Sequence, residues 1–276
     1  MQIFPAPAKL NLFLHVIGRR ADGYHLLQTA FRFVDFADQL AFSVRNDGVI
    51  KLMNPMPGLS DADNLCVRAA KRLQAESGKS LGVEIYLHKQ IPMGGGLGGG
   101  SSDAATTLIV LNRLWNINWD RQRLMTLGLE LGADVPVFVY GKNAFAEGVG
   151  EKLTSLTLPS AWYIVLTPPV HISTAEVFTS KELTRNTIPI RISAFYTGAG
   201  HNDLEPVVFR MQPVIGSWLQ WLKQQGVSKA AMSGSGACVF AELAEESDAL
   251  EVFKQIPDGM CGFLTQGLAE HPLLHY

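Results

Sequence analysis

One stretch of this 276-residue chain, MGGGLGGGSSDAATTLIVLNRLW at positions 93–115, places six glycines before a helix-like segment. Each glycine in a helix costs about 1 kcal/mol relative to alanine, so the run predicts a loop. The residues after it recur at helical spacing, and Ser101, Ser102 and Asp103 are residue types that cap helices. We therefore expect a strand over 83–88, a glycine loop, and a helix capped by these residues.

A glycine loop that opens a helix brings backbone N–H groups and the helix dipole close to an anion, which predicts a phosphate site. The P-loop pattern is absent because no lysine follows the glycines. The dinucleotide pattern GxGxxG is formally present as Gly94, Gly96 and Gly99, with Asp120 about 20 residues on. Asp120 starts a predicted helix and does not end a parallel strand, so we discount this pattern. A hinge without a ligand and another type of ATP-phosphate loop stay open.

The N-terminal segment alternates between polar and apolar residues. Residues 8–16 predict a half-buried strand that carries Lys9 and Asn11 on its polar face. Aromatic and β-branched residues predict a second strand over 24–36. Further strands are expected at 39–45 and 49–53, with a hairpin turn at 46–48.

The remaining segments predict an irregular mixture of helices and strands. Helices are expected from Asp63 to Gly78, over 121–131 after an Asp120 cap, over 206–226 with a break at Pro213, and over 248–256. Strands are expected at WYIVLTPP, within 228–243 after a glycine turn, and at CGFLTQGL. This order favours an α+β fold over a doubly wound sheet. The loop-like segment 156–162 suggests two domains, 1–157 and 158–276.

Composition narrows the functional classes. With 47% hydrophobic residues and a net charge of −2, the chain predicts a globular protein without a nucleic-acid or anionic-membrane surface. No apolar run approaches the ~20 residues of a membrane span, and no basic segment precedes the first apolar residues, so we expect no secretory signal. Cys66, Cys238 and Cys261 lie far apart and predict reduced thiols in a cytoplasmic enzyme.

Four blocks occur in order over nearly the whole chain: PAKLNLFLHVIGRRADGYH, PMGGGLGGGSSDAA, LGADVPVFVYGKNAFAEGVGE and SGSGACVFAE. Together they resemble the GHMP small-molecule kinases. The tract LNLFLHVIGRRADGYHLLQT resembles the members that phosphorylate the 2-hydroxyl of 4-diphosphocytidyl-2-C-methyl-D-erythritol in non-mevalonate isoprenoid synthesis. The resemblance implies an N-terminal domain like ribosomal protein S5 domain 2, a ferredoxin-like C-terminal domain, and an active site between them.

The resemblance also implies two catalytic residues. Asp134 in GADVP matches the family's catalytic aspartate and is the expected general base, although its position before Pro136 also suits a helix cap. Lys9 matches the catalytic lysine, whose charge would orient Asp134 and stabilise the developing alkoxide, although a lysine on a polar strand face is usually solvated. The two residues stand 125 positions apart, and we expect their side chains to meet near the glycine loop.

The remaining site residues are implied by the same blocks. The ATP-binding loop matches Pro92, Met93, Gly94, Gly95, Gly96, Leu97, Gly98, Gly99, Gly100, Ser101 and Ser102. Tyr24 and His25 match the family's cytosine site. Asn11 shares the polar strand face with Lys9 and is expected to hydrogen-bond the same substrate region. Outside these blocks, Phe178 in STAEVFTSKEL is the expected second stacking face, with Thr174 nearby. An isolated phenylalanine is more often a core residue. The glycines of 233–238 are expected to pack beside the phosphate loop.

ATP is the implied co-substrate, and Mg²⁺ is expected because it neutralises charge between the β- and γ-phosphates. No carboxylate cage is visible, so we assign no protein ligand to the metal. The charge of Asp103 should be offset by Mg²⁺ or point away from the phosphates. The expected protein is a monomer or homodimer in the bacterial cytoplasm. The alternatives are a GHMP kinase of another small alcohol such as homoserine, a nicotinamide-dependent oxidoreductase, and a non-catalytic nucleotide-binding module.

Overall fold

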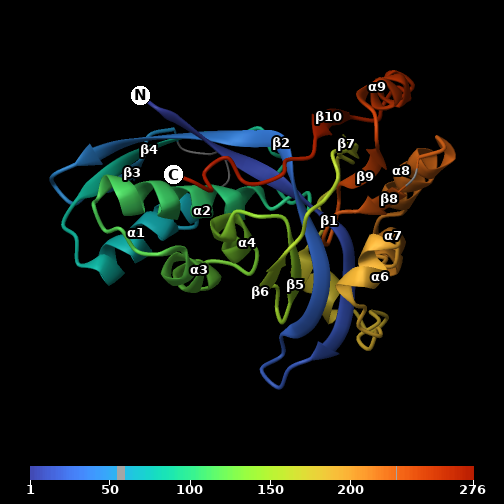
Figure 1. Cartoon of the computed structure of the whole chain (residues 1–276), viewed down its shortest axis with the longest axis horizontal. Helices are drawn as coiled ribbons and strands as arrows, with labels where there is room; N and C mark the ends of the chain where they lie inside the picture. Colours follow the sequence, from blue (N-terminus) through green and yellow to red (C-terminus); the bar gives the residue numbers. More distant parts are fainter. Residues whose placement is uncertain (55–59, 228) are drawn as a thin grey trace.

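A computed structural model describes residues 1–54, 60–227 and 229–276, so Ser228, the first residue of the predicted 228–243 segment, lies outside it. The described residues form two separate sheets with helices packed on them (Figure 1). This arrangement confirms the α+β, two-domain expectation. The predicted boundary after residue 157 stays a prediction.

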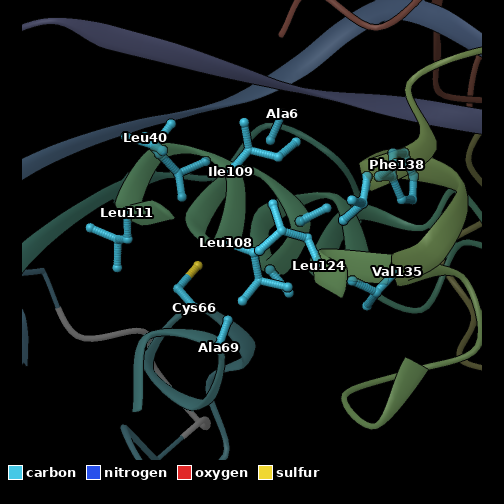
Figure 2. Close-up of a cluster of buried hydrophobic side chains, with 14 of the residues drawn as sticks. Ala6, Leu40, Cys66, Ala69, Leu108, Ile109, Leu111, Leu124, Val135 and Phe138 are labelled. Carbon is cyan, nitrogen blue, oxygen red and sulfur yellow. The ribbon is translucent and has the colours of Figure 1, made fainter. Parts of the chain in front are cut away.

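The first sheet is built on one long antiparallel hairpin that crosses the molecule (Figure 1). Its strands are β1 (Ile3–Arg19), β2 (His25–Arg45), β3 (Ile50–Leu52), β4 (Gly82–His88), β5 (Ala144–Glu147) and β6 (Lys152–Ser155), in the order β3-β4-β2-β5-β6 with β1 on β2. The helices of this half are α1 (Leu65–Ser77), α2 (Gly99–Leu114), α3 (Arg121–Leu129) and α4 (Val135–Tyr140). Figure 2 shows their apolar side chains meeting those of the long strands in one core.

The second sheet has the order β10-β7-β9-β8 and is antiparallel throughout. Its strands are β7 (Trp162–Leu166), β8 (Lys229–Met232), β9 (Val239–Leu243) and β10 (Gly262–Gln266). The helices of this half are α5 (Thr174–Thr179), α6 (Ile192–Tyr196), α7 (Glu205–Met211), α8 (Pro213–Gln224) and α9 (Glu246–Lys254). The fourth, first, third and second strands thus stand side by side with helical crossovers, which is the expected ferredoxin-like arrangement.

Strand β1 is buried on both faces, so the half-buried expectation for 8–16 is wrong. Phe4 belongs to the core of the first sheet and Leu14 to that of the second, while Leu10 lies in a third cluster that joins strands of both. The polar face is covered as well, because Lys9 is only 3% exposed. A single strand therefore supports both halves of the molecule.

Two further expectations need correction. The segments 24–36 and 39–45 form one continuous strand, β2, and no break separates them. The predicted hairpin at 46–48 is also wrong, because β3 pairs in parallel with β4 and not with β2. The turn residues predict the turn correctly, but β3 pairs with β4, which follows helix α1 in the sequence.

The C-terminal segment 267–276 returns to the first half of the molecule (Figure 1). The Leu268 amide donates to the Phe33 carbonyl over 2.8 Å, and the Asn143 side-chain amide donates to the Leu268 carbonyl over 2.8 Å. Leu273 is buried in the first core, and Arg121 donates to its carbonyl. Within the described residues no helix is long and apolar enough to cross a membrane.

Candidate active site

Lys9 is held by contacts on several sides. Its Nζ donates to the side-chain oxygen of Asn11 and, over 3.0 Å, to the Gly96 carbonyl. Its backbone N–H donates to the Leu97 carbonyl over 2.9 Å. The same Nζ lies 3.2 Å from Oδ2 of Asp134, so the expected contact between these two distant residues is present. Lys9 thereby joins strand β1, the glycine loop and the start of α4.

Asp134 occupies the N-cap position of α4, but its side chain makes no capping hydrogen bond. Its side chain is 34% exposed, whereas that of Lys9 is almost completely buried. The helix-cap explanation therefore does not account for this carboxylate. Its oxygens are paired with a fixed cation on one side and open on the other, which suits proton acceptance from a bound hydroxyl.

The glycine loop is shaped by close packing against the 233–236 turn. Gly96 has φ +74°, and a Cβ there would lie 2.1 Å from the Ser233 carbonyl oxygen. The Ser233 hydroxyl donates to the Gly96 carbonyl over 2.8 Å, and the Cys238 amide donates to the Gly95 carbonyl over 3.1 Å. The expectation that the two glycine turns pack together is confirmed.

The predicted cap of α2 is wrong. The N-cap residue is Gly98, which has the left-handed conformation with φ +72° and supplies no capping side chain. The helix begins at Gly99, so Ser101 and Ser102 lie in its first turn. Glycine alone turns the chain into the helix here, so the first N–H groups have no side-chain cap among the described residues and are available to an anion.

The loop separates two cavities. One has a volume of about 380 Å³ and is lined by Asn64, Leu65, Lys89 and the loop residues from Pro92 to Ser101. The other, of about 320 Å³, is lined by Lys9, Asn11, Asp134, Thr174, Phe178 and the 234–236 turn, among others. Four residues face both cavities: Gly94, Gly96, Gly98 and Ser101. This loop is therefore a shared wall across which a group could pass from one ligand to the other.

The other predicted loop residues have different surroundings. Ser102 is fully buried, and its hydroxyl has no hydrogen-bond partner among the described residues. Leu97 is a core residue, whereas Met93 is 68% exposed. Of the two serines, Ser101 is thus the one that reaches the cavities.

The predicted cytosine residues come from both halves of the molecule. The rings of His25 and Phe178 lie 5.1 Å apart at an angle of 34°. The hydroxyls of Thr174 and Ser235 are 2.8 Å apart. Tyr24 is 64% exposed at the β1–β2 turn. Phe178 lines the second cavity and its ring contacts that of His25, whereas Tyr24 lies at the surface.

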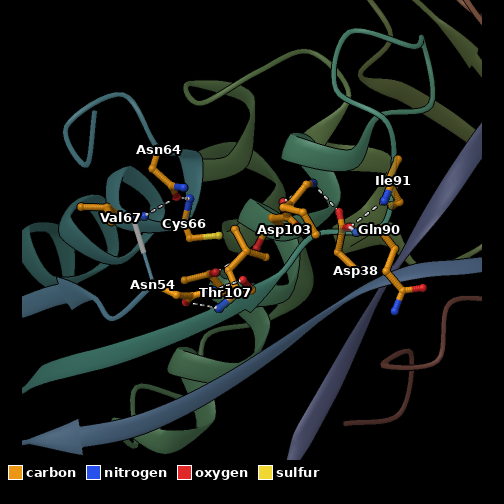
Figure 3. A network of polar contacts seen from close by, with 11 residues as sticks. Asp38, Asn54, Asn64, Cys66, Val67, Gln90, Ile91, Asp103 and Thr107 are labelled. Atoms are coloured by element: carbon orange, nitrogen blue, oxygen red, sulfur yellow. Dashed lines mark hydrogen bonds and ion pairs between the residues drawn. The ribbon is translucent and has the colours of Figure 1, made fainter. Parts of the chain in front are cut away.

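A buried ionic cluster lies behind the glycine loop (Figure 3). Lys89 bridges Asp38 and Asp103, at 2.8 Å from the latter, and Asp38 also accepts from the amides of Gln90 and Ile91. Asp103 is 3% exposed, and burial raises its pKa to about 7. Asp103 nevertheless lines the first cavity, so the expectation that it points away is wrong, and Lys89 is the cation that pairs with it.

Three further residues near the site, Asp38, Lys89 and Arg185, were not predicted from the sequence. A carboxylate inside the aromatic segment FRFVDFADQ was the available signal for Asp38, because a buried strand carries an acid only with a partner. Asp120, the acid of the discounted dinucleotide pattern, caps α3 through the Arg123 amide at 2.8 Å. It plays the structural role predicted for it.

Two family models match the chain: "GHMP kinases N terminal domain" over residues 64–142 and "GHMP kinases C terminal" over 190–260. The chain belongs to the GHMP kinase family, and it is accordingly a phosphotransferase that uses ATP. It is 71% identical over 275 residues to the 4-diphosphocytidyl-2-C-methyl-D-erythritol kinase of Nitrosomonas europaea, with 99% of each chain covered. It is 58% identical to the kinase of the same name from Thiobacillus denitrificans, covering 100% of this chain and 98% of the relative.

Solved structures agree with these matches. A crystal structure of 4-(cytidine 5'-diphospho)-2C-methyl-D-erythritol kinase superposes with a TM-score of 0.83 at 33% identity, covering 97% of this chain and 100% of that one. Homoserine kinase from Cytophaga hutchinsonii gives a TM-score of 0.70 at 16% identity, with 98% and 94% covered, which shows the shared fold alone. The predicted resemblance is confirmed, and the oxidoreductase alternative is wrong.

Proposed function

We propose that this chain transfers the γ-phosphate of ATP to the 2-hydroxyl of 4-diphosphocytidyl-2-C-methyl-D-erythritol, giving the 2-phosphate and ADP. The full-length identity to kinases of that name supports the substrate. The observation that carries the chemistry is the Lys9–Asp134 pair, which faces the second cavity beside the shared glycine wall.

In this proposal the first cavity holds ATP and the second holds the acceptor alcohol. Phosphates at the shared wall meet glycine N–H groups and the start of α2, a 16-residue helix whose dipole favours negative charge. Gly94, Gly96 and Gly98 have positive φ angles, which glycine adopts without the steric cost that other residues pay. The residues from Pro92 to Ser102 would then form the phosphate loop that the family resemblance implies, with Ser101 as its hydroxyl donor.

Asp134 is the proposed general base. Its exposed side takes the proton of the 2-hydroxyl while that oxygen attacks the γ-phosphorus and the bond to the ADP oxygen breaks. Lys9 stabilises the negative charge that develops on the attacking oxygen and keeps Asp134 oriented. Asn11 is fixed for the same region, because its side-chain amide donates to the Thr29 hydroxyl over 2.9 Å. The transfer is direct, with no phospho-enzyme.

Mg²⁺ would enter the site as part of the Mg–ATP substrate. Among the described residues no three acidic, histidine or cysteine side chains form a metal-binding group. Ser101 and Asp134 offer oxygen donors at the second cavity, which fits an ion that keeps most of its bonds to phosphate and water. The ion would neutralise charge between the β- and γ-phosphates.

The cytidine end is proposed to lie at Phe178 and His25. An aromatic face stacks on a pyrimidine, and a histidine ring bonds its polar edge. Thr174 and the exposed Tyr24 complete this end of the proposed site. The expected bacterial cytoplasm fits the three unpaired cysteines, Cys66, Cys238 and Cys261. A monomer or homodimer stays the prediction for the assembly.

Phosphorus NMR tests the proposal directly. Purified protein with Mg–ATP and the cytidyl substrate should give a new phosphomonoester signal together with ADP. Asp134→Asn should lower turnover by about 10²–10⁴-fold while ATP binding persists. Asp120→Asn is the matched control, since asparagine caps a helix as well as aspartate. ADP without the phosphomonoester, or equal turnover with homoserine, would contradict the proposed acceptor; full activity of Asp134→Asn would remove it as the base.

A further inference from the structure

Arg185 forms hydrogen bonds both with the ring of His25 and with backbone carbonyls at and after the end of helix α5. Its Nε lies 3.0 Å from Nε2 of His25. Its terminal nitrogens donate to the carbonyls of Phe178 at 2.9 Å, Ser180 at 2.6 Å and Leu183 at 3.1 Å. One guanidinium thus connects the start of β2, in the first half, with the segment that carries Phe178, in the second.

The contact with His25 fixes where the imidazole proton lies. A guanidinium has only donors and stays protonated, so Nε2 of His25 must be the acceptor. The proton of the neutral ring is then on Nδ1. In the described part of the chain, Nδ1 has no hydrogen-bond partner, so its N–H is free for a ligand. Burial, followed by the charges of Arg185 and Arg19, lowers the pKa of His25, which favours the neutral ring.

We propose that Arg185 is a positioning residue that fixes His25 as an Nδ1–H donor and thereby selects cytosine over uracil. The inference rests on the proposed cytidyl substrate. Cytosine presents an unprotonated N3, which accepts a hydrogen bond, whereas N3 of uracil carries a hydrogen. The Nδ1–H group of His25 can therefore donate to N3 of cytosine, whereas it would face the N3–H donor of uracil.

The same hydrogen bonds of Arg185 explain why the rings of His25 and Phe178 stay in contact. The Phe178 carbonyl accepts a hydrogen bond from Arg185, which fixes the position of this residue. The Phe178 ring lies 5.1 Å from that of His25. Removing Arg185 frees both the ring proton of His25 and the end of α5. The loss should therefore appear in substrate affinity and base choice, and not in the phosphoryl-transfer step at Lys9 and Asp134.

Nitrogen-15 NMR of the histidine rings tests the proton position without any substrate. The His25 signals are assigned by their loss in His25→Asn, and the sample is kept near pH 8, where the ring is neutral. We expect Nδ1 protonated and Nε2 unprotonated in the wild-type protein, and a mixture of both forms in Arg185→Ala. A wild-type ring protonated at Nε2, or an unchanged ring in Arg185→Ala, would overturn the proposal.

Kinetics then test base selection with the cytidyl substrate and its uridyl counterpart. In Arg185→Ala the KM for the cytidyl substrate should rise about 5–10-fold, the value of one neutral hydrogen bond, with kcat and the KM for ATP nearly unchanged. The preference for cytidine over uridine should fall by about tenfold. Arg19→Gln is the control, because it removes the other nearby charge while its amide still donates to the Gly23 carbonyl.

An unchanged base preference in folded Arg185→Ala, or an equal loss in Arg19→Gln, would overturn the selection role. Thermal unfolding of each variant checks that it is folded. If the wild-type protein does not phosphorylate the cytidyl substrate, the proposed function fails. The ring NMR and the relative binding of CDP and UDP need no turnover, so they still decide the role of Arg185.

Discussion

The ammonium nitrogen of Lys9 lies 3.2 Å from a carboxylate oxygen of Asp134, and both residues line the second cavity, yet the lysine side chain is only 3% exposed and that of the aspartate 34%. Lys9 is fixed by Asn11, Gly96 and the backbone of the glycine loop. The cation cannot swing away when a substrate enters, and the base remains reachable. This asymmetry separates the two proposed roles: the lysine as fixed charge, the aspartate as proton acceptor.

Replacing Lys9 by methionine keeps the volume and removes the charge. We expect kcat to fall about 10²–10³-fold, because a preorganised donor to the developing oxyanion is lost. Stability should fall by about 1–3 kcal/mol, since the Asn11 and Gly96 oxygens lose a buried donor. Steady-state kinetics and thermal unfolding measure both effects. A raised KM at unchanged kcat would show that Lys9 only binds substrate.

Gly96→Ala should be far more damaging than an alanine at another left-handed glycine. A Cβ at Gly96 would collide with the Ser233 carbonyl, whereas Gly78, with φ +67°, has open space around it. We expect a loss of about 1 kcal/mol for Gly78→Ala from backbone conformation alone, and about 2–4 kcal/mol for Gly96→Ala. Urea unfolding measures the difference. Equal losses would mean that the two turns separate without cost.

Asp103 makes stability depend on pH in an unusual direction. Its folded pKa of about 7 lies above its ordinary value of 3.8, so the folded protein binds this proton first. Its contribution to stability therefore falls as pH rises from about 4 to about 7 and is constant above. Asp103→Asn removes this contribution. The difference in unfolding free energy, wild type minus Asp103→Asn, should decrease across that window; a flat difference would contradict the buried acid.

His271, in the C-terminal segment, should act in the opposite direction. Burial, with a smaller contribution from Arg121, lowers its pKa to about 3, below the ordinary 6.5. The unfolded chain binds this proton first, so stability is retained above about pH 6.5 and lost as pH falls toward 3. The difference between wild type and His271→Gln should therefore increase with pH. His275→Gln, which changes an exposed histidine of the same segment, is the matched control.

Much of the fold followed from local patterns, and the exceptions have physical causes. Asp120 capped α3 as expected, and Pro213 began a second helix after α7, because both signals act on neighbouring backbone. The parallel pairing of β3 with β4 depends on a partner more than 30 residues away. The burial of Lys9 depends on the glycine loop that covers it. The alternation of polar and apolar residues shows which side chains share a face of a strand. It does not show which other elements cover that face.

The site divides in the same way. The Lys9–Asp134 contact and the packing of the two glycine turns were expected from the family resemblance, and the structure contains both. The ion pair between Asp38 and Lys89 was not predicted, because a buried ion pair leaves no periodic pattern in the sequence. Arg185 stands in a polar stretch that reads as an ordinary surface loop. Only the fold shows that its guanidinium reaches His25.

The return of residues 267–276 to the first half makes that half discontinuous along the chain. Its hairpin and helices leave the ribosome early, but Leu273 and the carbonyls that satisfy Arg121 come only after the entire second sheet has been synthesised. The first half thus cannot reach its final packing before the second sheet has been made. A chain that stops before residue 267 would therefore lack part of the first core and the carbonyls that accept from Arg121 at the start of α3.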